Sequence, residues 1–326
     1  MRKKLSNWTF ALIACAVGAA IFFIVPSIGK MLGWGDYIYI ASYTILQFAV
    51  LAIAWNILGG YTGYVNFGSA AFFAVGAYTT VFFHKFYPLP IPLLVALAAV
   101  AGGLVGLGMG YLTLRLRGAF FAIATLAMAV VLQTLIVNWS FVGGSRGAYV
   151  IRPSNIVPFE SYTQYLFLIM LTLVVIAVIV SRTIERSALG YGFATIRDDE
   201  LAAEASGVPT LKLKLIATAL SGAFMGMAGA PFPYFIGFLQ PSGVFGLEYA
   251  VNSIAMPMIG GTATWIGPLV GALLLGTLQQ VATVTISSAV NLLLVGLLLV
   301  GFVILAPNGL VGVVQNLFRK KRGSHK

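Results

Sequence analysis

Residues able to bind a small ligand gather at two places in this sequence, Gly59 to Ser69 and Gly260 to Gly271. The candidates are Thr62, Gly63, Asn66, Gly68, Ser69, Gly260, Gly261 and Thr262. Glycines and small polar residues at membrane depth favour a broken helix, whose free backbone groups are tolerated only beside a cavity or within protein. Free N–H groups suit a carboxylate, and free carbonyls suit an ammonium. We therefore predict that these residues line a path for a zwitterionic or amide ligand.

The composition predicts a membrane protein around these sites. Of 326 residues, 60% are hydrophobic and only 8% are charged, against about a quarter charged in soluble proteins. The net charge of +11 arises from residues at the two ends and in a few loops. It therefore indicates membrane orientation and excludes a nucleic-acid partner.

The elements that must position the candidates are about ten apolar segments, each near the ~20 residues that a spanning helix requires. They are 8–25, 37–59, 64–83, 89–112, 119–139, 162–181, 215–238, 244–260, 264–285 and 288–306. With both termini cytoplasmic, the inner loops hold 15 of the 19 Lys and Arg residues and the outer loops hold 4. This asymmetry predicts an all-α polytopic fold in one transmembrane domain, 1–326, with a basic cytoplasmic tail, 307–326. Glu248 and Pro257 interrupt the segment 244–260, which leaves its crossing open.

Glycines elsewhere predict close helix packing, because no polar residue accompanies them and small residues let membrane helices approach. These glycines are Gly76, Gly102, Gly103, Gly106, Gly108 and Gly110.

The chain carries no chemistry for an energy source of its own. It has no phosphate-binding G-x-x-x-x-G-K-[ST] loop, and His84 and His325 lack neighbours at metal-ligand spacing. Only Glu248 places a carboxylate inside a predicted span, near its outer end, where an interfacial position explains it. We predict no enzyme, no metal and no cofactor, with any ATP bound by partner subunits.

The longest predicted cytoplasmic loop, 182–214, contains a short helix from Ile196 to Ser206. Acidic residues fall in its first turns, Gly207 stands where a left-handed C-cap belongs, and Pro209 ends it. Charges on one side and small residues on the other suit a helix that docks on another protein, or an amphipathic connector along the membrane. The residues predicted to make the docking contact are Arg197, Asp198, Asp199, Glu200, Glu204 and Gly207.

A family resemblance rests on this loop and on two further stretches. The loop reads ATIRDDELAAEASG from Ala194 to Gly207. The others are LRLRG at 114–118, leading to GGSRG at 143–147, and MIGGT at 258–262, followed by Gly-Pro and Gly-Ala. Together they cover about residues 45 to 312 and resemble the branched-chain amino acid permease family of bacterial ATP-binding-cassette importers, second membrane subunit.

The resemblance implies a permease subunit in the bacterial inner membrane that works by alternating access. Its partners would be a sister permease subunit in a heterodimer, two cytoplasmic ATPase subunits and a periplasmic solute-binding protein. The loop helix from Arg197 to Gly207 would then be the coupling helix that receives the motion of the ATPases.

Departures from the family pattern leave the substrate open. Tyr64, Asn66 and Ser69 stand where the family has glutamine, serine and histidine, and Ala119 stands where an acidic residue is frequent. Branched-chain amino acids are the leading prediction. Other amino acids, urea, short amides, aromatic acids, sugars and nucleosides remain alternatives, as do a self-sufficient secondary carrier or channel and, from a different class, a membrane-embedded enzyme.

Overall fold

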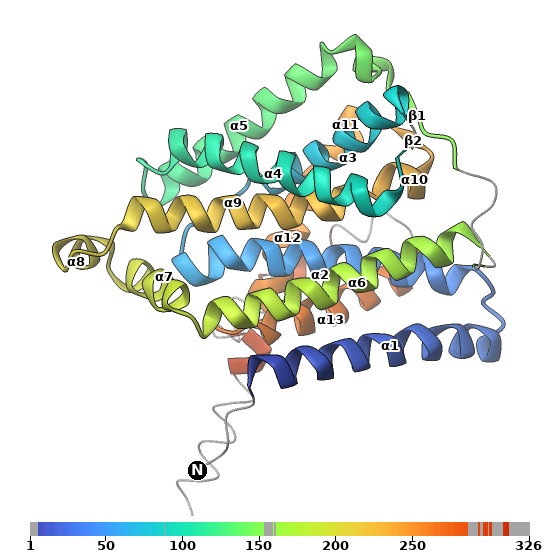
Figure 1. The fold of residues 1–326 in the computed structure, drawn as a ribbon, viewed down its shortest axis with the longest axis horizontal. Helices are drawn as coiled ribbons and strands as arrows, with labels where there is room; N and C mark the ends of the chain where they lie inside the picture. Colours follow the sequence, from blue (N-terminus) through green and yellow to red (C-terminus); the bar gives the residue numbers. More distant parts are fainter. Residues whose placement is uncertain are drawn as a thin grey trace, which may run out of the picture.

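The protein is a bundle of long helices (Figure 1) in a computed structural model that describes residues 6–87, 89–152, 159, 161–285, 293, 296–298, 300, 301 and 309–312. The longer helices are α1 (Asn7–Leu32), α2 (Tyr37–Thr62), α3 (Ser69–Phe86), α4 (Ile91–Thr113), α5 (Ala119–Val137), α6 (Tyr162–Glu185), α7 (Ala188–Asp198), α9 (Thr210–Gly229), α12 (Leu247–Gly260) and α13 (Ile266–Thr285). The shorter elements are η1 (Ser140–Val142), η2 (Gly144–Arg146), β1 (Ala148–Tyr149), α8 (Glu200–Ala205), α10 (Phe232–Ile236), β2 (Phe238–Leu239) and α11 (Pro241–Val244).

Seven helices in the described part of the chain are long and apolar enough to cross a membrane, against ten predicted spans. They include α1, α2, α4, α5, α6 and α13, and one segment that runs from Thr210 to Ile236. The predicted spans 64–83 and 244–260 form the shorter helices α3 and α12, with 18 and 14 residues. Fourteen residues extend only about 21 Å, less than the ~30 Å hydrocarbon core, so α12 alone is too short to cross. The predicted span 288–306 and the basic tail 307–326 lie largely outside the described residues.

The predicted cytoplasmic loops meet at one end of the bundle. In Figure 1, α7 and α8 lie at the left end, and α1 begins on that side. The loop after α4 lies there too, because Leu114 accepts a hydrogen bond from the first turns of α9. The loop after α12 joins them through the backbone N–H of Trp265, which donates to Glu185 at the end of α6 over 2.8 Å. Segments that the charge asymmetry assigns to one side of the membrane are thus together, as that prediction requires.

The opposite end is closed by short elements that the sequence does not predict. β1 pairs antiparallel with β2, with Ala148 opposite Leu239 and Tyr149 opposite Phe238. Arg152 fastens this end by donating to the carbonyl oxygens of Tyr234 and Phe235 in α10.

The α2 helix forms the core of the bundle. From Leu46 to Thr62 every residue of α2 is buried, against α6, α9, α12 and α13. Trp55 also donates its indole N–H to the carbonyl oxygen of Asn66, over 2.8 Å, which fixes the chain that follows α2. The end of α2 is therefore the most rigidly supported part of this region.

A seam of glycines joins α4 to α9. A Cβ atom at Gly102 would lie 2.3 Å from the carbonyl oxygen of Gly222, and one at Gly106 would lie 2.8 Å from that of Thr218. Gly76 of α3 packs in the same way against Gly226 of α9. The packing prediction is confirmed for these glycines, whereas it is wrong for Gly108 within the described part of the chain, where an added Cβ atom would meet nothing within 4 Å.

We expect Gly102→Ala to destabilise the protein strongly and Gly108→Ala to leave it unharmed. The first methyl group meets backbone that cannot move without separating α4 from α9, a cost of about 1–3 kcal/mol for overpacking. The second meets open space and removes the helix penalty of glycine, about 1 kcal/mol. The measurement is the temperature at which each variant, purified in detergent, loses its monodisperse chromatographic peak. Equal stability of the two variants would contradict the close packing of α4 against α9 at Gly102.

Candidate functional site

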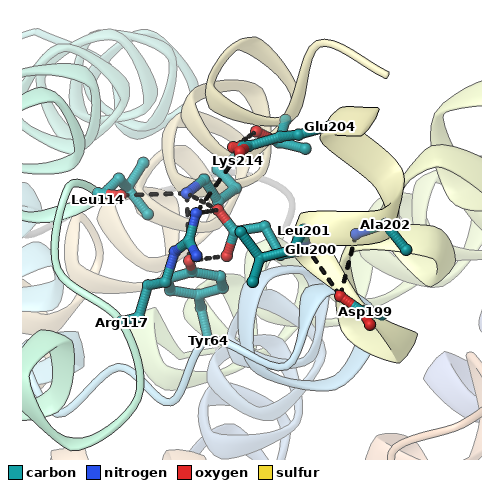
Figure 2. Close-up of polar contacts among 10 residues, drawn as sticks. Tyr64, Leu114, Arg117, Asp199, Glu200, Leu201, Ala202, Glu204 and Lys214 are labelled. Atoms are coloured by element: carbon teal, nitrogen blue, oxygen red, sulfur yellow. Dashed lines mark hydrogen bonds and ion pairs between the residues drawn. The ribbon is translucent and has the colours of Figure 1, made fainter. Parts of the chain in front are cut away.

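The candidate site is built around a buried lysine at the end of the bundle that carries α7 and α8. The ammonium of Lys214 lies 2.7 Å from Glu200 Oε1, 3.1 Å from the hydroxyl of Tyr64 and 3.1 Å from the carbonyl oxygen of Leu114. Its side chain is only 4% exposed and that of Glu200 only 12%. Figure 2 shows these side chains converging on Lys214. A lysine so deeply buried is stable as a cation only when its donors are paired in this way.

Further charges surround this pair. The hydroxyl of Tyr64 donates to Glu200 Oε2, and the guanidinium of Arg117 lies 3.6 Å from both Glu200 and Glu204. Thr210 donates to Glu204 Oε1 over 2.7 Å. We call these residues the Lys214 cluster. It consists of Tyr64, Leu114, Arg117, Glu200, Glu204, Thr210 and Lys214.

The Lys214 cluster ties four segments of the chain together. Tyr64 belongs to the break between α2 and α3, and Arg117 to the loop between α4 and α5. Glu200 opens α8, and Lys214 lies in the second turn of α9. A displacement of α8 therefore pulls directly on the end of the central helix α2 and on the start of α9. The arrangement can transmit mechanical force between α8 and the long helices α2 and α9.

The ionisation of Glu200 depends on its partners. Burial by itself raises its pKa, but the hydrogen bonds from Lys214 and Tyr64 and the charges of Lys214 and Arg117 outweigh burial. The pKa of Glu200 therefore lies below its ordinary value.

A pH dependence of stability follows from this lowered pKa. The stabilisation by ionised Glu200 is fully present above the unfolded-state pKa of about 4.3 and is lost as the pH falls through the lower folded-state value. We expect the melting temperature of the wild type to exceed that of Glu200→Gln by a constant margin from pH 5 to pH 8, and the margin to shrink below about pH 4. A margin that already shrinks between pH 7 and pH 5 would contradict the assignment.

The predicted helix from Ile196 to Ser206 is wrong as a single element. The chain forms two helices, α7 and α8, separated at Asp199, whose backbone is extended at φ −161°. The carboxylate of Asp199 accepts from the N–H groups of Leu201 and Ala202, over 2.9 and 3.1 Å, and so caps α8. Aspartate is favoured at the N-cap of a helix because its side chain accepts hydrogen bonds from the first free backbone N–H groups. The run of acidic residues here therefore ends α7 and begins α8.

The predicted C-cap of this segment is confirmed. Gly207 is left-handed, at φ +82°. Its N–H donates to Glu204, and the N–H of Val208 donates to Ala203, which is the Schellman pattern. The helix α8 is therefore fixed at both ends although it has only six residues.

The residues predicted to make the docking contact divide into two sets. The side chain of Asp198 is 74% exposed and that of Arg197 is 40% exposed. Glu200, in contrast, is largely buried in the Lys214 cluster. Glu204 also contacts the cluster, but its side chain remains partly exposed. Leu201 is 63% exposed on α8, although the sequence does not single it out. The surface open to a partner therefore centres on Leu201 and Asp198.

The predicted break between α2 and α3 is confirmed, and its residues fall into two environments. The helix α2 ends at Thr62, Gly63 is left-handed at φ +78°, and α3 begins at Ser69. Asn66 is buried and its side chain accepts from the N–H of Gly68 over 2.8 Å. Ser69 is hydrogen-bonded to Ser253 of α12 over 2.7 Å. Asn66, Gly68 and Ser69 thus hold the break against the bundle.

A cleft of about 520 Å³ adjoins the other part of the break. Its lining residues are Thr62, Gly63, Tyr64, Val65, Arg117, Gly118, Ala119, Ala122, Ile196, Arg197 and Glu200. It therefore brings together Thr62 and Gly63, predicted to line a path, and Arg197 and Glu200, predicted to contact a partner. The structure places these two sets of candidates at a single location.

The second predicted junction, after α12, is a tight helical hairpin. A Cβ atom at Gly260 would lie 1.8 Å from the carbonyl oxygen of Gly267, and one at Gly271 would lie 1.9 Å from that of Met256. Thr262 reaches the first junction, because its carbonyl oxygen would lie 2.9 Å from a Cβ at Gly60. The two junctions are neighbours, and Gly260 and Gly261 bring α12 and α13 together.

Sequence reasoning missed five of the seven members of the cluster as functional candidates: Tyr64, Leu114, Arg117, Thr210 and Lys214. The available signal was a lysine at the start of an apolar span and a tyrosine in place of a glutamine. Neither signal shows which side chain the residue contacts, because the contacting residues are distant in the chain. No group of three or more His, Cys, Asp or Glu side chains that could hold a metal lies in the described ranges.

Comparison with known proteins places this chain in a family. Residues 37–303 match the family described as branched-chain amino acid transport system, permease component. The chain is 27% identical over 312 residues to the high-affinity branched-chain amino acid transport system permease protein LivM of Salmonella typhimurium and to that of Escherichia coli, covering 88% of this chain and 72% of each relative. It is 26% identical to the autoinducer 2 import system permease protein LsrC of Yersinia enterocolitica, over 69% of this chain and 64% of that protein. No solved structure matches. The chain belongs to the family of branched-chain amino acid transport system permease components.

Proposed function

We propose that this protein is the membrane-spanning permease subunit of a binding-protein-dependent importer in the bacterial inner membrane. It carries branched-chain or related amino acids by alternating access, driven by ATPase subunits bound at the end that carries α7 and α8. The observation that carries the proposal is the Lys214 cluster, because it links a partly exposed cytoplasmic helix, α8, to the end of the central helix α2.

The coupling step is a shift between two arrangements of the helices. A partner that binds one arrangement of α8 more tightly shifts the equilibrium toward it, by as much as its affinities differ. Glu200 of α8 is hydrogen-bonded to both Tyr64 and Lys214. A movement of α8 therefore also displaces the break at 63–68 and the start of α9. The movement that the ATPases impose on α8 is thereby transmitted to the helices that line the solute path.

Two related membrane subunits form the proposed pore. Similarity to LivM proteins and to the probable branched-chain amino acid transport permease protein LivH of Methanocaldococcus jannaschii, 23% identical over 77% of this chain and 84% of that protein, supports a pair of homologous subunits. A periplasmic binding protein delivers the solute to the end that carries β1 and β2.

Reconstitution tests this function. Liposomes that contain this chain, a sister permease and the two ATPases, with the binding protein outside, are expected to accumulate leucine, isoleucine and valine only when they enclose ATP. The chain alone is the control and is expected to carry none of them. Gradient-driven uptake by the chain alone would favour the secondary carrier and refute the importer.

A further inference from the structure

The cleft beside the break has the composition of a site for a small zwitterion. Its volume of about 520 Å³ falls in the range of roughly 300–1,000 Å³ that small-molecule sites occupy. Its lining includes Ile196 and Arg197 of α7 and Glu200 of α8, so it lies at the end of the bundle where the proposed ATPase contact lies. The cleft combines two cations, one carboxylate, backbone groups and aliphatic side chains.

The two cations face the cleft with weak partners of their own. Among the described residues, Arg117 pairs with Glu200 and Glu204 only at 3.6 Å, and Arg197 pairs with Asp198 only at 3.4 Å. Their side chains are 49% and 40% exposed. Each guanidinium has five donors, so both retain N–H groups for a ligand carboxylate, which arginine binds in a bidentate manner.

Candidate acceptors for an ammonium line the same cleft beside Arg197, since a Cβ atom at Gly63 would lie 3.3 Å from Arg197 Cγ. The helix α2 ends at Thr62, and the left-handed Gly63 turns the chain away. The carbonyls of the last turn of a helix lack intrahelical donors, and Thr62 and Gly63 both line the cleft. Val65, Ala122 and Ile196 add apolar surface between the charged groups, which suits a branched aliphatic side chain.

We propose that this cleft binds the amino acid product at the cytoplasmic face and that the bound product slows its own import. The proposal rests on the proposed function for the identity of the solute. The carboxylate lies between Arg117 and Arg197, the ammonium lies at the carbonyl end of α2, and the side chain contacts Val65, Ala122 and Ile196.

Inhibition follows from the position of the two arginines. Arg197 belongs to α7, whereas Arg117 belongs to the loop between α4 and α5. A carboxylate held by both connects α7 to the loop between α4 and α5, and so favours the arrangement in which both arginines line the cleft. A ligand shifts the equilibrium toward the arrangement that it binds best. Because import requires passage through a second arrangement, product accumulation lowers the rate.

Protection of an introduced thiol tests the binding site directly. The single cysteine, Cys15, is replaced by serine, and Ala122→Cys provides a thiol in the cleft. In inside-out membrane vesicles that contain the assembled importer, L-leucine is expected to slow modification of this thiol by an impermeant maleimide severalfold. Leucinol lacks the carboxylate and isocaproate lacks the ammonium, so both are expected to protect weakly. The matched control, Leu211→Cys, is exposed on α9 outside the cleft, and leucine is expected to leave its rate unchanged.

A separate variant tests the contact between Arg117 and the carboxylate of the ligand. With Arg117→Gln in the same background, half-protection is expected to require a roughly 10- to 100-fold higher leucine concentration, because a hydrogen bond to a charged group is lost. If Arg117→Gln does not assemble, Ala119→Leu, which fills the cleft without changing a charge, must abolish the protection instead. In proteoliposomes, leucine enclosed with ATP is expected to lower initial leucine uptake in the wild type. The ratio of uptake with and without enclosed leucine should approach one in either variant.

The outcomes separate this proposal from the proposed function. ATP-driven leucine uptake without any protection of Ala122→Cys would overturn the cleft site and leave the importer standing. Equal protection by leucine and leucinol, or protection that depends on anionic lipid and not on leucine, would also overturn it. Failure of the complete complex to import any branched-chain amino acid would instead refute the proposed substrate.

Discussion

Lys214→Met is expected to destabilise the protein by about 3–5 kcal/mol and to abolish ATP-driven transport. The substitution removes the cation but leaves Glu200 buried, with only the Tyr64 hydroxyl and a long contact to Arg117. Breaking a buried ion pair from one side has a cost of this size, because the remaining charge loses its compensation. Thermal unfolding of the purified subunit, and leucine uptake by the complete complex, measure the two effects.

The matched control is the double variant Lys214→Met with Glu200→Gln. It removes both charges, so we expect much of the stability to return, while the Lys214–Glu200 pair between α9 and α8 remains absent and transport remains low. Recovery of transport together with stability would contradict the role of the Lys214–Glu200 pair in transmission. An equal loss of stability in the single and double variants would show that the two residues do not interact.

Leu201→Glu is expected to reduce ATP-driven uptake by more than tenfold and to leave the fold intact. Leu201 is 63% exposed on α8, in a segment outside the apolar spans. In the proposed complex Leu201 is buried against the ATPase, and one such residue at an interface can contribute about 2 kcal/mol or more. Co-purification of the ATPase subunits measures the contact, and the melting temperature of the subunit checks the fold.

A graded series sharpens this test. Leu201→Ala removes the apolar contact without adding a charge, so its effect is expected to lie between those of the wild type and Leu201→Glu. Asp199→Ala provides the comparison for helix integrity, because it removes the N-cap of α8 at a cost of about 1 kcal/mol and leaves Leu201 in place. Full ATPase association in Leu201→Glu would exclude α8 as the docking surface.

The break after α2 shows how far local sequence reasoning reaches. Glycine in the left-handed region at Gly63 ends a helix for reasons that act within a few residues. Gly207 ends α8 in the same way, so both ends were predictable. The division between α7 and α8 was missed because Asp198, Asp199 and Glu200 look equally suited to a helix start, and only Asp199 takes the capping conformation.

The seam between α4 and α9 shows where such reasoning fails. Gly102 and Gly108 lie on one apolar helix, yet a Cβ atom at Gly102 would meet the backbone of α9, whereas one at Gly108 would meet nothing within 4 Å among the described residues. Sequence identifies both as small residues in a membrane helix. The difference arises from the direction in which α4 presents each residue to its neighbour.

The sequence by itself determined the membrane location, the helical fold, the family and the end of the molecule at which the charged loops gather. Hydropathy, helix capping and charge asymmetry are each properties of short segments, so they can be read along the chain. Only the tertiary structure decided which charges meet. Tyr64 lies 136 residues from Glu200 and 150 residues from Lys214, and their encounter depends on how α2, α8 and α9 pack. For the same reason Thr62 and Gly63, predicted to line a path, share one cleft with Arg197 and Glu200, predicted to couple to the ATPases, because helix packing brought them together.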